Sequence, residues 1–270
     1  MAYLEIKFFF SSAETSNVLI ALLSQLEYEG FEEETGVLKA FIQKDLFDET
    51  ALKKLGSQLN IQYTATELPD ENWNAIWESN FHPVIIGNWV LRAEFHKPQD
   101  SSGNEIIITP KMSFGTGHHA TTFMMVLQMQ DIDFKDKHVL DFGTGTGVLA
   151  ILAHKLGATS VVAIDNDNLC IENASENFIK NNIETIELKK ADHVDAKPGF
   201  DIILANITKN VIADNFPLFN KHLINNGILL LSGLLSSDEE EILLLAATHN
   251  FILHKKLQQE NWICLQLIKQ

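Results

Sequence analysis

Three glycines at alternate positions follow a short apolar segment near the middle of this 270-residue chain. Residues 139–142 read Val-Leu-Asp-Phe, and Gly143, Gly145 and Gly147 come directly after them. Glycine can adopt backbone angles that are closed to other residues and lets a ligand approach the main chain. The helix expected at residues 148–156, which Gly157 would end, offers free N–H groups at its start. The pattern therefore predicts a strand that enters a nucleotide-binding turn.

Asp165 supplies the second part of such a site. It ends a predicted strand at residues 160–164 and lies 22 residues after Gly143, the spacing at which an acidic side chain meets ribose hydroxyls in a β-α-β unit. The dinucleotide fingerprint would need a third glycine at position 148, which is Val148. This difference disfavours NAD and favours S-adenosylmethionine, which has ribose hydroxyls and an amino-acid tail but no pyrophosphate.

A second glycine-rich loop precedes this turn in the sequence. It contains Gly115 and Gly117 and leads into an apolar helix that we expect at residues 122–129. Two such loops in one chain predict two walls of one pocket. Thr121 and Thr122 could cap the helix or bind ligand oxygens, and the two roles are compatible.

Potential metal ligands are sparse in this sequence. His118 and His119 are adjacent, but no third ligand recurs at a recognisable spacing, so we predict no metal site. Cys170 and Cys264 lie far apart with no second pair, which indicates neither a disulfide framework nor a thiolate metal site.

Polar residues also end the next two predicted strands. Asp192 follows a strand expected at residues 185–191, and Asn206 ends a strand expected at residues 201–206. The carboxyl ends of parallel strands line a shared crevice, so we expect Asp165, Asp192 and Asn206 to meet there.

The C-terminal part alternates predicted strands and helices. We expect Pro217 to start a fresh helical turn and Asn226-Gly227 to form a turn before the next strand. Residues 251–257 and 262–268 alternate about a polar turn and predict an antiparallel hairpin. An α/β sheet that ends in such a hairpin is typical of methyltransferases and not of dinucleotide dehydrogenases.

Residues 1–68 predict a separate small domain with the order β-α-β-β-α-β, the ferredoxin-like α+β arrangement. The first helix would be capped by Ser12, and the second by Asp48. Apolar residues at helical spacing predict the buried face of the first helix, and they are Val18, Leu19, Leu22, Leu23 and Leu26.

A linker helix is expected at residues 69–82, where Trp73 and Trp77 are four apart and face the same side. The remaining residues, 83–270, form the S-adenosylmethionine-dependent domain in this interpretation. Its first segments, 84–86, 89–95 and 105–109, are predicted strands around turns at Gly87-Asn88 and Gly103-Asn104.

The chain has a formal net charge of −16, from 20 Lys and Arg against 36 Asp and Glu. Such a charge repels a phosphate backbone and argues against nonspecific nucleic-acid binding. Residues 1–68 carry 11 acidic residues and 5 lysines, a net charge of −6, so this domain is the candidate docking surface for a basic protein. A solvated acidic surface without any partner explains the charge equally well.

No apolar segment approaches the roughly 20 residues of a membrane span, and the first residues lack a basic segment before a signal-like apolar stretch. We therefore expect a cytoplasmic protein that does not associate with a membrane.

The chain resembles the PrmA family of ribosomal protein methyltransferases. The resemblance rests on the loop at residues 114–122 (Phe-Gly-Thr-Gly-His-His-Ala-Thr-Thr), the turn at 141–147, Asp165 and the segment Ala205-Asn206-Ile207, and it covers nearly the whole length. It implies a Rossmann-like class I methyltransferase sheet in which Thr122, Gly143, Asp165 and Asn206 contact S-adenosylmethionine. The family usually has Leu where this chain has Thr208, and Ser is frequent at the position of Thr146.

The resemblance also implies the reaction. Methyl groups would pass from S-adenosylmethionine to lysine side-chain and N-terminal amines of ribosomal protein eleven of the large subunit, leaving S-adenosylhomocysteine. We expect a monomer that meets this basic protein without direct nucleic-acid contact. The expected cofactor-binding residues are Thr122, Gly143, Gly145, Asp165, Asp192 and Asn206. Asn206 is also the candidate catalytic residue, because its amide or main-chain carbonyl could accept amine hydrogens.

Two other functions stay open at this point. A nucleic-acid amine methyltransferase is one, since Asn206 ends the strand where such enzymes hold the target amine, although the next residues, 207–209, offer no aromatic ring to stack a flipped base. A non-catalytic binding module that keeps the methyltransferase fold is the other, and the intact glycine turn and Asp165 argue against it.

Overall fold

The protein forms two compact units, Met1–Phe81 and His82–Gln270. The computed structural model describes residues 3–10, 13–24, 26–34, 36–59, 61–67, 81–98, 104–111, 113–194 and 199–270. The predicted cap Ser12, the linker helix with Trp73 and Trp77, and the turn residue Gly103 lie outside these ranges. No helix in the described part of the chain is long and apolar enough to cross a membrane.

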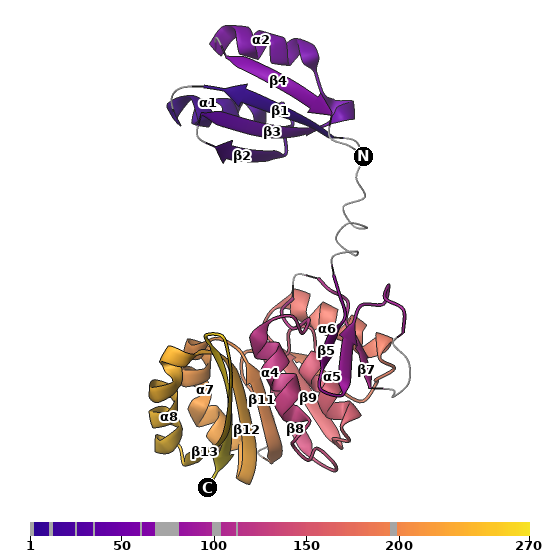
Figure 1. Ribbon diagram of the computed structural model, residues 1–270, viewed down its shortest axis with the longest axis vertical. Coiled ribbons are helices and arrows are strands. Elements are labelled where there is room, and N and C mark those ends of the chain that lie inside the picture. Colours follow the sequence, from indigo (N-terminus) through magenta and orange to yellow (C-terminus); the bar gives the residue numbers. More distant parts are fainter. Residues whose placement is uncertain are drawn as a thin grey trace. The chain divides into compact units, whose positions relative to one another are not determined.

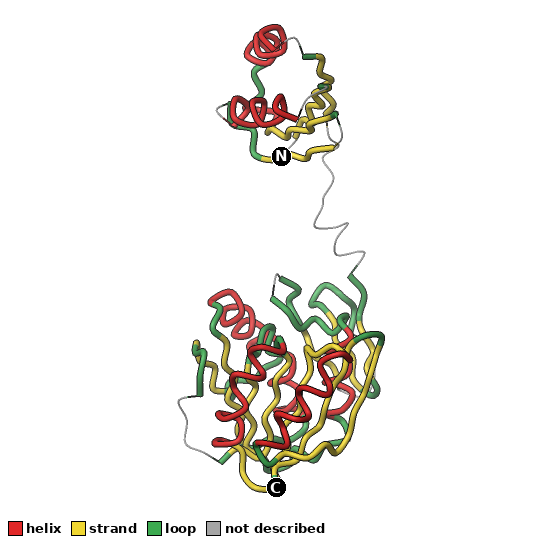
Figure 2. The backbone as a smooth tube through the Cα atoms, turned by 90° about the vertical axis from the view of Figure 1, so that its left-hand side faces the viewer, coloured by secondary structure: helices red, strands yellow, loops and turns green. Residues whose placement is uncertain are grey.

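The first unit is a four-stranded antiparallel sheet with its two α-helices on one side (Figure 2). Its elements are β1 (Tyr3–Phe9), α1 (Ala13–Ser24), β2 (Gly30–Glu34), β3 (Val37–Gln43), the 3-10 helix η1 (Lys44–Leu46), α2 (Glu49–Leu59) and β4 (Gln62–Glu67). The strand order in the sheet is β2-β3-β1-β4. The first unit therefore has the β-α-β-β-α-β order along the chain, with β1 and β3 at its centre.

The core of the first unit contains the alternate residues of the central strands β1 and β3 and a stripe of residues on α1. Ile6 and Phe8 in β1 are fully buried, as is Leu23 in α1. The prediction that Val18 belongs to this stripe is wrong, since its side chain is 47% exposed. Neighbouring residues in a helix point in directions about 100° apart, so Val18 turns away from the sheet that its neighbour Leu19 covers.

The second unit holds a three-stranded sheet and a seven-stranded sheet. Its first elements are β5 (Val84–Ile86), β6 (Trp89–Arg92), β7 (Glu105–Ile107), α4 (Ala120–Met129), β8 (His138–Phe142), α5 (Val148–Lys155), β9 (Ser160–Asp165), α6 (Asn168–Lys180) and β10 (Glu187–Lys190). They are followed by β11 (Phe200–Asn206), α7 (Lys209–His222), β12 (Leu223–Leu235), η2 (Ser236–Asp238), α8 (Glu239–Thr248), β13 (Phe251–Gln259) and β14 (Trp262–Lys269).

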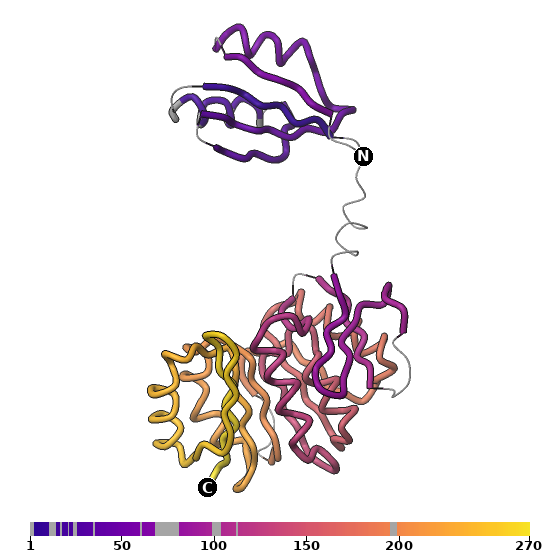
Figure 3. Tube along the Cα trace, in the orientation of Figure 1, coloured from indigo at the N-terminus to yellow at the C-terminus, as the bar shows by residue number. Residues whose placement is uncertain are grey.

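The large sheet has the order β10-β9-β8-β11-β12-β14-β13. Strands β10, β9, β8, β11 and β12 are parallel, while β14 pairs antiparallel with both β12 and β13. The C-terminal hairpin, coloured yellow in Figure 3, thus closes one edge of the sheet as predicted. The arrangement is a Rossmann-like α/β sheet that ends in an antiparallel hairpin.

Helices cover both faces of this sheet, so its central strands are buried on both sides (Figure 1). Val139 in β8 packs with residues of α4, α5 and α6 on one face, whereas its neighbour Leu140 packs with residues of α7 and α8 on the other. Burial on both faces explains why β8 and β11 are apolar without strict alternation.

Three local predictions for the second unit are wrong. Strand β6 ends at Arg92 and not at residue 95, because Ala93 and His96 close a turn in which the Ala93 N–H donates to His96 Nδ1 at 3.1 Å. Pro217 does not start a new turn but lies inside α7, which continues because Phe216 and Phe219 are fully buried against the sheet. Asn226 has a left-handed φ of 61°, yet it lies within the long strand β12 and does not precede it.

Candidate active site

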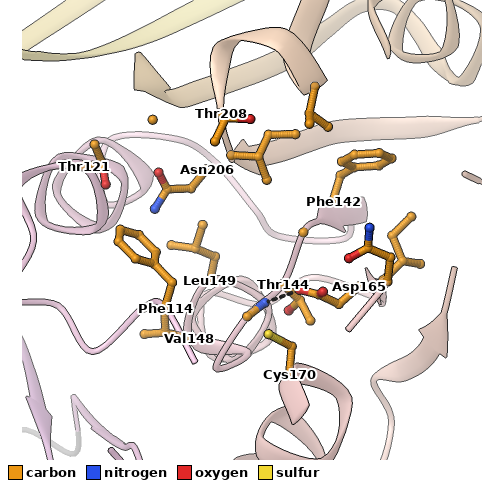
Figure 4. Close-up of a pocket in the computed structure, with 18 of the residues that line it drawn as sticks. Phe114, Thr121, Phe142, Thr144, Val148, Leu149, Asp165, Cys170, Asn206 and Thr208 are labelled. Carbon is orange, nitrogen blue, oxygen red and sulfur yellow. Dashed lines mark hydrogen bonds between the residues drawn. The ribbon is translucent and has the colours of Figure 1, made fainter. Parts of the chain in front are cut away.

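A cavity of about 510 Å³ lies at the carboxyl ends of the parallel strands, within the range typical of small-molecule sites. Figure 4 shows side chains that project into it from α5, β9, β11 and the loop before α4. Its lining comprises Phe114, Gly115, His119, Thr121, Phe142, Gly143, Thr144, Gly145, Val148, Leu149, Ile164, Asp165, Asn166, Cys170, Ala191, Asp192, Asn206, Ile207, Thr208, Val211, Gly233 and Trp262. The two glycine-rich loops therefore form walls of one pocket.

Positions 143 and 145 in the glycine turn each require a residue without a side chain. Gly143 and Gly145 have left-handed φ angles of 75° and 55°. A Cβ atom on Gly143 would lie 2.3 Å from Cγ2 of Ile207, and one on Gly145 would lie 2.4 Å from the main-chain oxygen of Phe114. Both positions therefore let other parts of the pocket wall approach the turn closely.

Asp165 holds the glycine turn against the end of β9. Its Oδ2 accepts a hydrogen bond from the Gly145 N–H at 2.9 Å, and its Oδ1 accepts one from the Asp167 N–H at 3.0 Å. A carboxylate can accept about four hydrogen bonds, so Asp165 keeps acceptor capacity for a ligand after both of these are made.

Asn206 ends β11 at the cavity, and its side chain points toward α4 in Figure 4. Its Nδ2 donates to Oγ1 of Thr122 at 3.2 Å. Its Oδ1 is buried and has no hydrogen-bond partner within the described parts of the chain. A buried carbonyl oxygen of this kind is destabilising unless a donor reaches it.

Neither Thr121 nor Thr122 is the helix cap that the sequence suggested, and only Thr121 lines the cavity. Thr121 lines the cavity, while Thr122 is fully buried behind Asn206 and does not line it. Neither threonine caps α4, because the helix begins one residue before them and His119 is its N-cap. The ring Nδ1 of His119 accepts a hydrogen bond from the Thr121 N–H at 3.3 Å.

Three aromatic rings form one wall of the cavity. The ring of His119 lies between Phe114 and Trp262, with ring centroids 5.1 Å and 4.9 Å away and edge-to-face geometry. Trp262 is a site residue that its local sequence does not reveal. Because β14 runs antiparallel to the other central strands, its first residue reaches the edge where the parallel strands end, and only the strand order reveals this.

Asp192 lies at the more open side of the cavity. Its side chain is 76% exposed and accepts a hydrogen bond from His193 Nδ1 at 2.5 Å. That hydrogen bond lowers the pKa of Asp192 below its ordinary value. The structure thus brings Asp165, Asp192 and Asn206, the three residues at predicted strand ends, to one cavity.

Asp141 is a buried carboxyl group beneath the glycine turn. Its Oδ2 accepts hydrogen bonds from Thr144 Oγ1 at 2.6 Å and from the Ala150 N–H at 3.2 Å. Burial raises the pKa of Asp141 to about 7, although these two hydrogen bonds oppose the rise.

No group of three His, Cys, Asp or Glu side chains is arranged to hold a metal ion among the described residues. His118 Nε2 lies 3.0 Å from the main-chain oxygen of His82, and His119 serves as the helix cap. Both cysteines are free thiols.

The chain is similar to known proteins over nearly its full length. A family model described as "Ribosomal protein L11 methyltransferase (PrmA)" matches residues 11–270. A ribosomal protein L11 methyltransferase of Phocaeicola vulgatus is 37% identical over 281 aligned positions, which cover 99% of both chains. Another from Chlorobaculum parvum is 38% identical and covers 90% of this chain and 89% of the relative.

Solved structures agree on the fold. The ribosomal protein L11 methylase of Lactobacillus delbrueckii subsp. bulgaricus superposes with a TM-score of 0.66 at 31% identity, covering 70% of this chain and 100% of that one. A methyltransferase from Pyrococcus furiosus, at a TM-score of 0.52 and 16% identity, shares the fold alone.

Proposed function

Because the chain belongs to the family of ribosomal protein L11 methyltransferases, we propose that it transfers methyl groups from S-adenosylmethionine to amino groups of ribosomal protein L11. The family and fold make it an S-adenosylmethionine-dependent methyltransferase. The proposal extends this to lysine side-chain and N-terminal amines as acceptors. We also propose a cytoplasmic location, because the proposed acceptor is a ribosomal protein.

The residues at the cavity fit this cofactor. Asp165 has free acceptor capacity for two ribose hydroxyls, and Gly143 and Gly145 leave the turn without side chains where an amino-acid tail would approach. Asp192 lies at the rim and adds a further acceptor. When bound, S-adenosylmethionine supplies an electrophilic methyl group on a sulfonium centre.

The single observation that carries the proposal is the buried, unpartnered Oδ1 of Asn206 at this cavity. An amine held at the end of β11 would donate one hydrogen to this oxygen, which would fix the orientation of its nitrogen. The Nδ2 atom of the same amide is bonded to Thr122, and this bond restricts rotation of the Asn206 side chain. The chain would thus act mainly by aligning the reactants.

The acceptor amine must be neutral to attack. Holding a lysine with an ordinary pKa of about 10.4 neutral at about pH 7.4 costs about 4 kcal/mol, and an α-amine costs under about 1 kcal/mol. Phe114, His119 and Trp262 form an aromatic wall of the cavity, and partial desolvation of an amine against these rings would favour its neutral form. These effects remove the need for a dedicated strong base.

We assign substrate recognition to residues 1–68. This segment has its own hydrophobic core, and its sequence contains none of the glycine-rich or strand-end motifs expected to bind the cofactor. Its net charge of −6 suits a basic protein substrate. Residues 83–270 would hold the cofactor and carry out the transfer.

A labelling experiment tests the proposal. The protein is incubated with S-adenosylmethionine carrying a labelled methyl group and, in separate reactions, with ribosomal protein L11, with L11 whose amines have been acetylated, and with ribosomal RNA. We expect label in untreated L11 alone. Label in RNA would favour the nucleic-acid amine methyltransferase, and cofactor binding without any transfer would favour the non-catalytic module.

A further inference from the structure

Helix α6 and its C-cap residue bury three asparagines, spaced four residues apart. Asn173, Asn177 and Asn181 are 1%, 0% and 9% exposed. Asparagine is a weak helix former, and a buried amide is destabilising unless its oxygen and nitrogen find partners. The partners of each amide therefore show what it holds in place.

Asn181 acts on the small sheet of the second unit. Its Oδ1 accepts from the Ile107 N–H at 3.0 Å, and its Nδ2 donates to the Ile107 main-chain oxygen at 2.7 Å. The two bonds satisfy the N–H and the C=O of Ile107 in β7, as a neighbouring strand would. Neither bond involves a glycine-rich loop.

Asn177 connects the segment that follows β7 to the glycine turn. Its Oδ1 accepts from the Thr109 N–H at 2.8 Å, where the chain leaves β7 toward Phe114. Its Nδ2 donates to the main-chain oxygen of Thr146 at 2.8 Å, within the glycine turn. One buried amide thus holds Thr109, in the segment that leads to Phe114, and Thr146, in the glycine turn.

Thr146 continues this connection. Its N–H donates to the main-chain oxygen of Phe114 at 3.0 Å, and its Oγ1 donates to that of Gly115 at 2.7 Å. Asn177 and Thr146 are fully buried and neither lines the cavity. They can therefore influence a bound ligand only through the loops that they hold.

We propose that Asn177 is a positioning residue for S-adenosylmethionine, which holds the loops at residues 113–117 and 143–147 in the spacing that the cofactor needs. This inference rests on the proposed function. Loops that are fixed before binding lose less conformational entropy when the ligand arrives, so the connection through Asn177 and Thr146 raises affinity without touching the ligand.

Asn177→Ala and Asn181→Ala form a matched pair, because both remove a buried amide from the same face of α6. Calorimetry with S-adenosylmethionine and thermal unfolding are measured for each variant. We expect Asn177→Ala to weaken cofactor binding by about tenfold and Asn181→Ala by no more than about twofold, although both lower the melting temperature. Equal effects of the two variants on the dissociation constant would overturn the proposal.

If Asn177→Ala does not fold, Thr146→Val provides a second test, because it breaks the same connection at Thr146. It removes the hydroxyl bond to Gly115 and should also weaken cofactor binding more than Asn181→Ala does. If the two variants are combined, their effects should be less than additive, because each already loosens the same contact. Strict additivity would contradict a shared connection.

Amide hydrogen exchange without cofactor separates this inference from the proposed function. In Asn177→Ala, exchange should accelerate at residues 113–117 and 143–147, and in Asn181→Ala it should accelerate at β7. Unprotected wild-type loops, or no change in Asn177→Ala, would overturn the positioning role. A wild-type protein with protected loops that does not bind S-adenosylmethionine would contradict the proposed function instead.

Discussion

The side-chain amide of Asn206 donates to the hydroxyl of Thr122 at 3.2 Å and so joins the end of β11 to the first turn of α4. Residues 84 positions apart in sequence thereby fix the orientation of one amide at the cavity. The bond uses one of the two amide hydrogens, while Oδ1 has no hydrogen-bond partner among the described residues.

Thr122→Val tests this relationship. Valine has nearly the same shape but cannot accept the hydrogen bond, so the Asn206 amide is free to turn. We expect kcat for L11 methylation to fall by about tenfold, as for the loss of one hydrogen bond. Thr122→Ser keeps the hydroxyl and should retain most of the activity in the same steady-state assay. Equal activity of Thr122→Val and wild type would contradict the role.

Asp165→Ala should weaken S-adenosylmethionine binding by about 2 to 4 kcal/mol, because ribose hydroxyls and the Gly145 N–H lose their acceptor. Calorimetry measures this change. Asp167→Ala is the matched control, since Asp167 caps α6 by accepting from the Leu169 N–H at 2.9 Å and does not line the cavity. It should lower stability by about 1 kcal/mol and leave the cofactor affinity near wild type. Unchanged affinity in folded Asp165→Ala would remove Asp165 from the site.

Gly145→Ala should impair cofactor binding more than Gly143→Ala. The new Cβ at position 145 meets the main-chain oxygen of Phe114 at 2.4 Å and separates the two loops, whereas at position 143 it meets only the Ile207 side chain at 2.3 Å. Adding Ile207→Ala should therefore recover part of the binding lost in Gly143→Ala, while it should not help Gly145→Ala. Dissociation constants of the two double variants decide between these outcomes.

Asp141 should make stability depend on pH. Burial raises its pKa from the ordinary 3.8 to about 7, so between these values the folded chain holds a proton that the unfolded chain has released. Stability from this group is then highest at acidic pH and falls as pH rises through about 7, by up to about 1.4 kcal/mol per pH unit. Urea unfolding of wild type and Asp141→Asn across this window should give curves that diverge. Parallel curves would show that Asp141 is ionised throughout.

Deletion of residues 1–68 should separate recognition from cofactor binding. The core of residues 82–270 contains no residue of the first unit among those described, so the truncated protein should fold and bind S-adenosylmethionine. Its kcat/KM for intact L11 should collapse, because a tethered docking surface supplies effective concentration and orientation. In the full chain, added salt should raise the KM for L11 more than the dissociation constant of the cofactor. An unchanged KM after truncation would contradict recognition by this segment.

The strand-end residues could be predicted because their signals are local. Gly143, Asp165 and Asn206 each follow an apolar strand, and parallel strands bring such ends to one edge whatever the remaining contacts are. The C-terminal hairpin was predictable for the same reason, since its two alternating segments flank a short polar turn.

The residues that the sequence did not reveal depend on long-range packing. Trp262 reaches the cavity only through the antiparallel direction of β14, and Asn177 bonds to both Thr109 and Thr146 only because of the face that α6 presents. Pro217 is compatible with a continuous helix because the buried rings around it outweigh one missing N–H. The cap of α4 was misassigned to threonine because local propensity favours it over His119.

Intact-mass and tandem mass spectrometry of purified L11, incubated with this protein and S-adenosylmethionine, detects the proposed methyl transfer itself. We predict mass increments of whole methyl groups, located on lysine side chains and the N-terminal amine, that disappear with Asp165→Ala. Unmodified L11 in the presence of a wild-type protein that binds the cofactor would contradict the account.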